Sequence, residues 1–325
     1  MRRREFITLL GGAAAVIPMT ARAQRSAPAV VGVLSPEGQK TGNVNGLVQG
    51  LRELGYVEGR NIRFEYRWAE GRFDRLPELA ADLVRLKVDV IVAFVTQAAE
   101  VAKRETSTIP IVMVGVSDPV GAGLAASLAH PGGNVTGTSS LAAAVVGKQL
   151  ELLKLVAPNG SGVATMFNPT NVTFQTLQVN AAKTASQTLG LQLRFLEVRA
   201  PSEFEAAFDT VVQEQKGALL ILIDPLFIAN SKALAELSVK SRLITMTGYR
   251  AFAEAGALMS YGPNYFDSYK AAAPYVDKIL KGDNPADLPI DQSSRFEFVV
   301  NMKTAKMLGI EIPTSVLGFA SEVIE

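Results

Sequence analysis

The chain has no cysteine, one histidine and one tryptophan among its 325 residues. The missing cysteine excludes disulfide bonds, so the folded state depends on its apolar core for stability. It also excludes a cysteine nucleophile, and a single histidine cannot build a metal cluster. That histidine, His130, lies in the turn-forming sequence AHPGGN, where it is read as a loop residue, with a catalytic role as the alternative. No metal or cofactor is therefore expected.

Several sequence signals of enzymes and of nucleic-acid-binding proteins are also missing. The 32 basic and 31 acidic residues nearly balance, which leaves no basic excess for a nucleic-acid backbone. There is no G-x-S-x-G elbow, no Walker A motif and no G-x-G-x-x-G loop. The carboxylates are scattered, without a close pair that acid–base catalysis would need. We expect a protein that is not an enzyme and does not bind nucleic acid.

No apolar run after residue 24 is long enough to span a membrane as a helix, but the N-terminus has a pattern of its own. Residues 2–4 are arginines, residues 6–19 carry no charge, and residues 21–23 read Ala-Arg-Ala. This order is typical of an export signal, and Arg3-Arg4-Glu5-Phe6 is similar to the twin-arginine signature. We expect residues 1–23 to be a cleaved export signal of the twin-arginine type. The Sec route and an uncleaved anchor helix are the alternatives.

The missing cysteine matters again at this signal. A bacterial lipoprotein carries its lipid on a cysteine directly after the cleavage site, and this chain has none. We therefore expect a soluble protein that is released into the periplasm and is not lipid-anchored. Removal of residues 1–23 takes away four arginines and one glutamate, so the net charge of the mature chain becomes slightly negative.

From residue 29 onwards, short apolar runs alternate with longer segments of helical spacing. Continuous apolar strands separated by helices predict parallel sheets that are covered on both faces. The alternation runs twice, so we expect an α/β fold of two Rossmann-like, doubly wound lobes. Strands are predicted at 29–35, 61–68, 88–95, 109–115, 134–140, 161–168, 191–198, 217–224, 242–247, 257–264 and 296–301. Helices are predicted at 42–55, 73–87, 96–106, 147–158, 174–189, 204–215, 229–240 and 267–280.

Short polar side chains follow many of the predicted strands. In open parallel sheets, ligands bind beyond the carboxyl ends of the strands. Helix N-termini at these ends offer free N–H groups and a positive dipole end, which suit a carboxylate. The strand ends carry Ser35, Thr96, Gln97, Ala98, Ser117, Asp118 and Val120 in the first half, and Asn168, Asp224 and Tyr249 in the second.

Longer segments point to a family. LRELGYVEGRNIRFEYRWAEG, STIPIVMVGVSDPVGAGLAASLAHPGGNVTG, ALMSYGPN, YVDKILKGDNPADLPI and FEFVVNMKTAKMLGIEIP resemble the ABC-transporter substrate-binding proteins of the group that includes the tryptophan- and tyrosine-binding lipoproteins. The resemblance covers residues 28–325. It implies the type I periplasmic-binding fold, in which three hinge crossings join two lobes and the ligand lies in the cleft. We expect residues 28–140 with about 262–290 to form one lobe, and residues 141–261 with about 291–325 to form the other. The chain departs from its many lipoprotein relatives because it lacks the lipid-bearing cysteine.

The resemblance also implies roles for the residues at the strand ends. Residues 96–98 match the stretch that holds a ligand carboxylate, and residues 117–120 match a turn that lines the cleft. Asn168 and Asp224 match polar positions of the second lobe, and Asp224 is a candidate partner for a ligand amine. Each has a structural alternative, because Ser, Thr, Asn and Asp before a helix commonly cap it and Asp before Pro commonly forms a turn.

Three aromatic residues are candidates to pack against an apolar ligand body: Tyr249, Tyr261 and Phe227. Tyr261 precedes Gly262, so it is also read as a residue of a hinge crossing.

The function implied is that of a periplasmic solute-binding component of an ABC importer. The lobes would close on a small ligand, and the closed form would deliver it to the membrane permease and its ATPase. The implied ligand is an amino acid or another small carboxylate, aromatic ones included, and the protein is expected to be a monomer. The alternative is a periplasmic ligand sensor that feeds a signalling partner.

Overall fold

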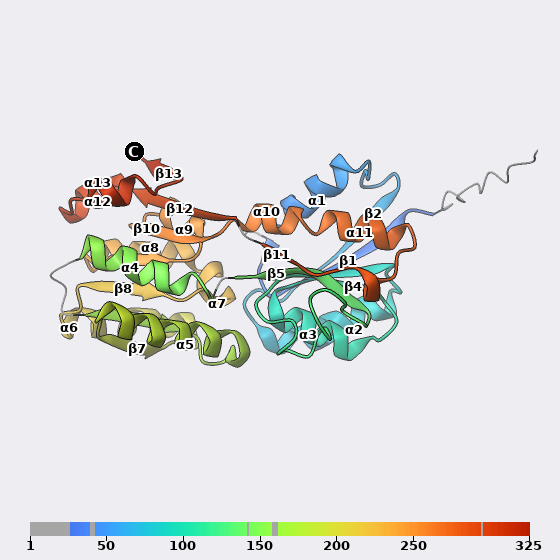
Figure 1. The fold of residues 1–325 in the computed structure, drawn as a ribbon, viewed down its shortest axis with the longest axis horizontal. Coiled ribbons are helices and arrows are strands. Elements are labelled where there is room, and N and C mark those ends of the chain that lie inside the picture. Colours follow the sequence, from blue (N-terminus) through green and yellow to red (C-terminus); the bar gives the residue numbers. More distant parts are fainter. Residues whose placement is uncertain (1–26, 40–42, 142, 158–161, 294) are drawn as a thin grey trace, which may run out of the picture.

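The computed structural model describes residues 27–39, 43–141, 143–157, 162–293 and 295–325. The predicted export signal lies outside these residues. Figure 1 shows two lobes side by side, each built around one sheet. None of the helices in the described ranges is both long and apolar enough to cross a membrane.

The first lobe contains a six-stranded parallel sheet in the order β11-β5-β4-β3-β1-β2. Helices cover both of its faces, and each face buries its own apolar cluster. This explains why the central strands are apolar without alternation. The strands are β1 (Ala29–Ser35), β2 (Ile62–Trp68), β3 (Val90–Phe94), β4 (Ile111–Val116), β5 (Val135–Ser140) and β11 (Asp291–Ser293). The helices are α1 (Val44–Glu53), α10 (Tyr265–Lys270) and α11 (Ala273–Leu280) on one face, and α2 (Leu76–Arg85) and α3 (Val95–Glu105) on the other.

The second lobe contains a seven-stranded sheet in the order β13-β12-β10-β9-β8-β6-β7. Its strands are β6 (Val163–Phe167), β7 (Leu193–Glu197), β8 (Ala218–Ile221), β9 (Ile244–Thr247), β10 (Met259–Pro263), β12 (Phe296–Asn301) and β13 (Glu322–Ile324). One face packs against α4 (Val146–Val156), α5 (Val172–Leu189), α12 (Met302–Leu308) and α13 (Thr314–Leu317). The other packs against α6 (Phe204–Gln213), α7 (Pro225–Ala229), α8 (Ser231–Lys240) and α9 (Arg250–Glu254). Single 3-10 turns occur at η2 (Phe73–Arg75), η3 (Pro201–Glu203) and η4 (Pro285–Asp287).

The predicted α/β fold of two doubly wound lobes is confirmed, but the expectation of wholly parallel sheets is wrong for one strand pair. β10 and β12 are antiparallel. β10 leaves the second lobe toward the first, whereas β12 enters the second lobe from the first, so the two strands run in opposite directions.

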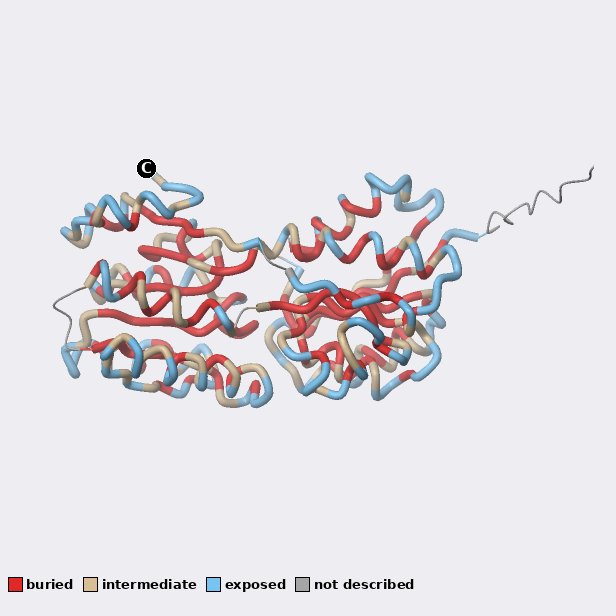
Figure 2. The backbone as a smooth tube through the Cα atoms, in the orientation of Figure 1, coloured by how far each residue is buried: buried red, intermediate tan, exposed pale blue. Residues whose placement is uncertain are grey.

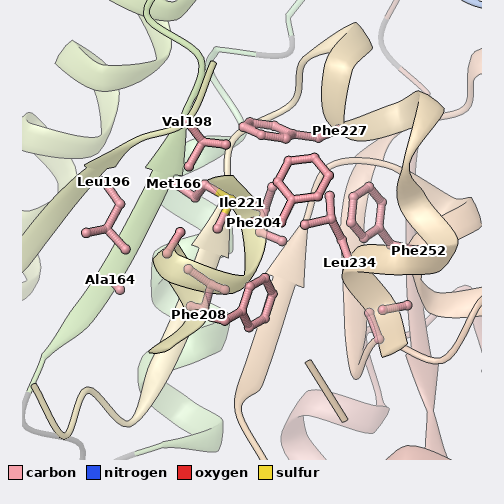
Figure 3. Packing of buried hydrophobic residues seen from close by; sticks show 14 of the residues in the cluster. Ala164, Met166, Leu196, Val198, Phe204, Phe208, Ile221, Phe227, Leu234 and Phe252 are labelled. Carbon is pink, nitrogen blue, oxygen red and sulfur yellow. The ribbon is translucent and has the colours of Figure 1, made fainter. Parts of the chain in front are cut away.

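Burial follows the strands in both lobes, and the outer helix surfaces are exposed (Figure 2). On α6, Phe204, Ala207, Phe208 and Val211 recur at helical spacing and are all buried. Figure 3 shows the two phenylalanines of this set packed in the core of the second lobe, with Phe227 near Phe204. Phe227 is 1% exposed and its ring centroid lies 6.1 Å from that of Phe204, so the structure places this candidate ligand contact in the core.

The chain passes between the lobes after β5, after β10 and after β11. The last two crossings touch, because the Asn264 N–H donates to the Arg295 carbonyl at 3.2 Å. Close to them, a Cβ atom on Gly262 would lie 2.0 Å from the Gly248 carbonyl oxygen. The two backbone segments approach closely enough that only glycine fits at position 262.

Some element boundaries differ from the expected ones. The single helix expected at 267–280 is two helices, α10 and α11, and Pro274 stands in the first turn of the second. The helix expected at 229–240 is preceded by the separate short helix α7. The short elements α9, α13, β11 and β13 had no clear sequence signal, since three to five residues carry too little periodicity.

Candidate functional site

A cavity lies between the two lobes, at the carboxyl ends of the strands. The free space between its side chains is about 20 Å³. The side chains leave room at its centre for about one or two water-sized molecules. A ligand of amino-acid size would therefore have to widen this closed form. The lining residues are Val95, Thr96, Gln97, Gly115 and Ser140 from the first lobe, Phe174, Ile223, Asp224, Pro225 and Ile228 from the second, and Tyr265 from α10.

The N-terminus of α3 forms the first-lobe side of the cavity. The chain turns from β3 into α3 without a loop, and Val95 makes this turn with a φ of +60°. Such a φ is strained for a β-branched residue, and strain of this kind clusters at ligand sites. No side chain caps the helix, because its N-cap residue is Phe94. The first N–H groups of α3 and its positive dipole end are thus available to an anion.

Asp224 is the charged residue of the second-lobe wall. It is fully buried, and each of its carboxylate oxygens accepts two hydrogen bonds. Oδ1 accepts from Asn168 Nδ2 at 3.0 Å and from the Leu226 N–H at 2.9 Å. Oδ2 accepts from Asn171 Nδ2 at 2.7 Å and from Gln175 Nε2 at 3.2 Å. Burial raises the pKa of Asp224, and the bonds from the asparagines oppose that rise.

Asn171 links the two walls of the cavity. While its Nδ2 donates to Asp224, its Oδ1 accepts a hydrogen bond from Gln97 Nε2 of the first lobe. The hydrogen bond from Gln97 to Asn171 therefore joins the two lobes next to the cavity. Asn171 was not among the predicted site residues. Its position as the N-cap residue of a long helix was the signal that could have identified it.

A second contact between the lobes lies beside the ring of Tyr265. Asn43 Nδ2 of the first lobe is 3.0 Å from the Tyr249 hydroxyl of the second and 3.1 Å from Glu37 Oε2. The ring of Tyr249 meets that of Tyr265 edge to face, with 5.3 Å between the centroids. Burial, and next the nearby Glu37 carboxylate, raise the pKa values of both phenols, so these hydroxyls stay protonated.

The structure brings three of the predicted residues, Thr96, Gln97 and Asp224, to the cavity wall. Thr96 lies inside the first turn of α3 and is not its cap, whereas Asp224 caps α7 through the Leu226 N–H. Asn168 lies behind the wall, bonded to Asp224, and Ala98 is buried in the first-lobe core.

The other predicted residues do not line this cavity. Ser35 is buried at the end of β1, where its Oγ accepts from the Glu37 N–H at 3.1 Å. Asp118 is exposed and accepts from the Gly121 N–H at 2.8 Å, which is the turn role given as its alternative. Val120 is exposed, and the Ser117 Oγ is buried with no partner within the described ranges.

Tyr261 packs in the second lobe, with its ring 6.1 Å from those of Phe296 and Phe298. The ligand-binding roles of all these residues stay predictions.

The sequence analysis missed much of the cavity wall, because that wall is apolar and comes from segments distant in sequence. The main residues missed are Phe174, Ile228 and Tyr265. Within the described parts of the chain, no group of three or more His, Asp or Glu residues is placed to hold a metal ion.

Among solved structures, the arrangement of the lobes compares better with a ligand complex than with a ligand-free, open form. The chain matches the structure of an ABC domain in complex with L-Trp from Streptococcus pneumoniae, with 28% identity and a TM-score of 0.83 over 92% of this chain and 100% of that one. It matches the ligand-free, open structure of a Clostridium difficile substrate-binding protein with adhesive properties less well. That TM-score is 0.65, at 27% identity over 91% of this chain and 99% of that one. Identity and coverage are nearly equal, so the lobes lie closer to the arrangement in the L-Trp complex.

Comparisons of the sequence identify relatives of the same kind. The chain is 27% identical over 266 residues to the tyrosine-binding protein of Clostridioides difficile (strain R20291), which covers 82% of this chain and 76% of that protein. The family model for ABC transporter substrate-binding proteins matches residues 29–324. The chain belongs to the ABC transporter substrate-binding protein family, whose members bind ligands and are not enzymes.

Proposed function

We propose that this protein is the periplasmic solute-binding component of an ABC importer. The proposal rests on one observation: both lobes line a single cavity at the carboxyl ends of their strands. Residues 28–140 with about 262–290 and the adjoining strand β11 would move against residues 141–261 with the rest of the C-terminal segment. Residues 1–23 would direct export by the twin-arginine route, and the released protein would be a monomer in the periplasm.

Ligand capture would work by hinge closure. The closed form is held by Gln97 with Asn171 and by Asn43 with Tyr249, and each pair joins one lobe to the other. A ligand that touches both walls binds the closed form more tightly and shifts the open–closed equilibrium by that difference in affinity. In the closed form, the surfaces of the two lobes would together bind the permease, which works with its ATPase.

The chemistry of the wall supports a ligand with an apolar body and one polar head. Phe174, Ile223, Ile228 and Tyr265 supply most of the apolar lining. The uncapped N-terminus of α3 suits a carboxylate. The relatives named for tyrosine and solved with L-Trp support the same class, an amino acid or another small carboxylate, aromatic ones included.

A thermal-shift screen of the chain from Gln24 onwards tests this function. The panel contains amino acids, aromatic acids, short-chain carboxylates and sugars. A ligand at about 100 times its Kd adds about 2.7 kcal/mol to stability, which for this size corresponds to a rise in Tm of several degrees. Gln97→Glu places a negative charge at the N-terminus of α3 and should abolish the response to carboxylates. Gln213→Glu on the exposed side of α6 is the matched control and should keep it. A response to sugars alone would contradict the carboxylate class.

The sensor alternative uses the same cavity and differs only in the partner. Neighbouring genes for a permease and an ATPase would support import, whereas a neighbouring signalling gene would support the sensor.

A further inference from the structure

Asp224 is the only carboxylate among the described residues that line the cavity. An amino-acid ligand carries an ammonium group, and burying that charge without an anionic partner costs several kcal/mol. The site therefore suits an amino acid only if Asp224 can accept a hydrogen bond from the ligand's ammonium group.

The hydrogen bonds of Asp224 leave it no free acceptor position. Each oxygen already accepts two N–H groups, at 2.7 to 3.2 Å. All four donors belong to the second lobe, as Asp224 does, so opening the hinge does not release them. An ammonium would have to displace one of these donors. Within the described residues, Asn168 Nδ2 and Asn171 Nδ2 make no other hydrogen bond, and Gln175 Nε2 would keep only its bond of 2.9 Å to the Ile223 carbonyl.

Other groups near the cavity do not replace Asp224. Glu37 lies behind Tyr265 in the contact with Asn43 and is not part of the wall. Ser140 and Thr96 contribute hydroxyl groups, which are neutral acceptors. On the opposite side, the free N–H groups of α3 are suited to an anionic head.

We propose that the cavity selects apolar carboxylic acids that lack an α-ammonium group over the corresponding amino acids. The inference rests on the proposed function and narrows its ligand class. The site would hold the carboxylate at α3 and the apolar body against Phe174, Ile228 and Tyr265. The Asp224 cluster would form a polar floor whose carboxylate oxygens are already occupied by the four N–H donors.

Matched pairs of ligands test the proposal by isothermal titration calorimetry of the chain from Gln24. The pairs are 3-phenylpropanoate with L-phenylalanine, indole-3-propanoate with L-tryptophan, and 4-methylpentanoate with L-leucine, and each pair differs only in the amine. We expect the acid to bind at least about tenfold more tightly, a difference of about 1.4 kcal/mol, in every pair that binds. Equal or tighter binding of the amino acid would overturn the inference but leave solute binding intact. No binding of either member in all pairs would overturn the inference together with the carboxylate class of the proposed function.

A variant tests the reason for the selectivity. Asn171→Ala removes one donor from Asp224 Oδ2 and leaves a free acceptor, so the preference for the acid should shrink several-fold or reverse. Asn180→Ala, on an exposed turn of the same helix, is the control and should leave the preference unchanged. An unchanged preference in folded Asn171→Ala, verified by its melting curve, would show that Asp224 saturation does not set the selectivity.

Discussion

Asn43 of the first lobe donates a hydrogen bond of 3.0 Å to the Tyr249 hydroxyl of the second lobe, 206 positions away in the chain. The bond exists only while the lobes are close together. It therefore contributes to the free energy of closure and not to the stability of either lobe alone.

Tyr249→Phe should weaken ligand affinity by about fivefold, because a buried hydrogen bond contributes about 1 kcal/mol. Calorimetry measures the affinity, and small-angle X-ray scattering should show a larger mean radius of gyration for the variant. Tyr275→Phe is the matched control, since its hydroxyl bonds Pro289 and Asp291 within the first lobe. Equal loss of affinity in both variants would argue against a specific role for Tyr249 in closure.

Thr96→Ala should lower ligand affinity without unfolding the protein. Thr96 lines the cavity in the first turn of α3, and alanine is well tolerated in a helix. Asp118→Ala should have a smaller effect on affinity, because that side chain is exposed and bonds the Gly121 N–H instead. A melting temperature that falls sharply for Thr96→Ala while the affinity is unchanged would contradict the assigned position.

Gly262→Ala should destabilise the protein by about 1–3 kcal/mol, because its Cβ would overlap the Gly248 carbonyl oxygen and the backbone must shift. Denaturant unfolding measures the loss. Gly133→Ala is the control, because a Cβ atom there would meet nothing within 4 Å. Similar stability of the two variants would show that the backbone near the hinge yields easily.

The stability of the protein should depend on pH through Asp224. Burial raises the pKa of this carboxyl above its ordinary value of 3.8, so the folded protein holds the proton to a higher pH than the unfolded chain does. The stability linked to that proton is complete below the unfolded pKa and is lost as the pH rises through the folded pKa.

Asp224→Asn, which does not titrate at this position, provides the reference. Denaturant unfolding of both proteins between about pH 3.5 and 7 gives the difference in their free energies of unfolding. The wild-type protein should have its greatest advantage, or its smallest deficit, at the acid end. A difference that moves in favour of the wild type as the pH rises would contradict the raised pKa.

The strand ends show how far the sequence could locate the site. A polar residue directly after an apolar strand can be read from the sequence, and Thr96, Gln97 and Asp224 were found in that way. The same rule also selected Ser35 and Asp118, which bond their own neighbouring backbone. The rule cannot separate these cases, because whether a side chain faces its own turn or the other lobe depends on the angle between the lobes.

The sequence by itself determined the alternation of strands and helices, and with it the two doubly wound lobes, because those patterns depend on residues close together in the chain. The family resemblance followed from long local segments for the same reason. Only the tertiary structure decided what the cavity is made of. Asn171 meets Gln97 across 74 positions, and Tyr265 reaches the wall from a crossing segment, so neither contact has a local signal. The saturation of Asp224 likewise depends on three side chains brought in by α5 and its preceding turn. Packing between distant segments, and not local propensity, sets the chemistry that a ligand would meet.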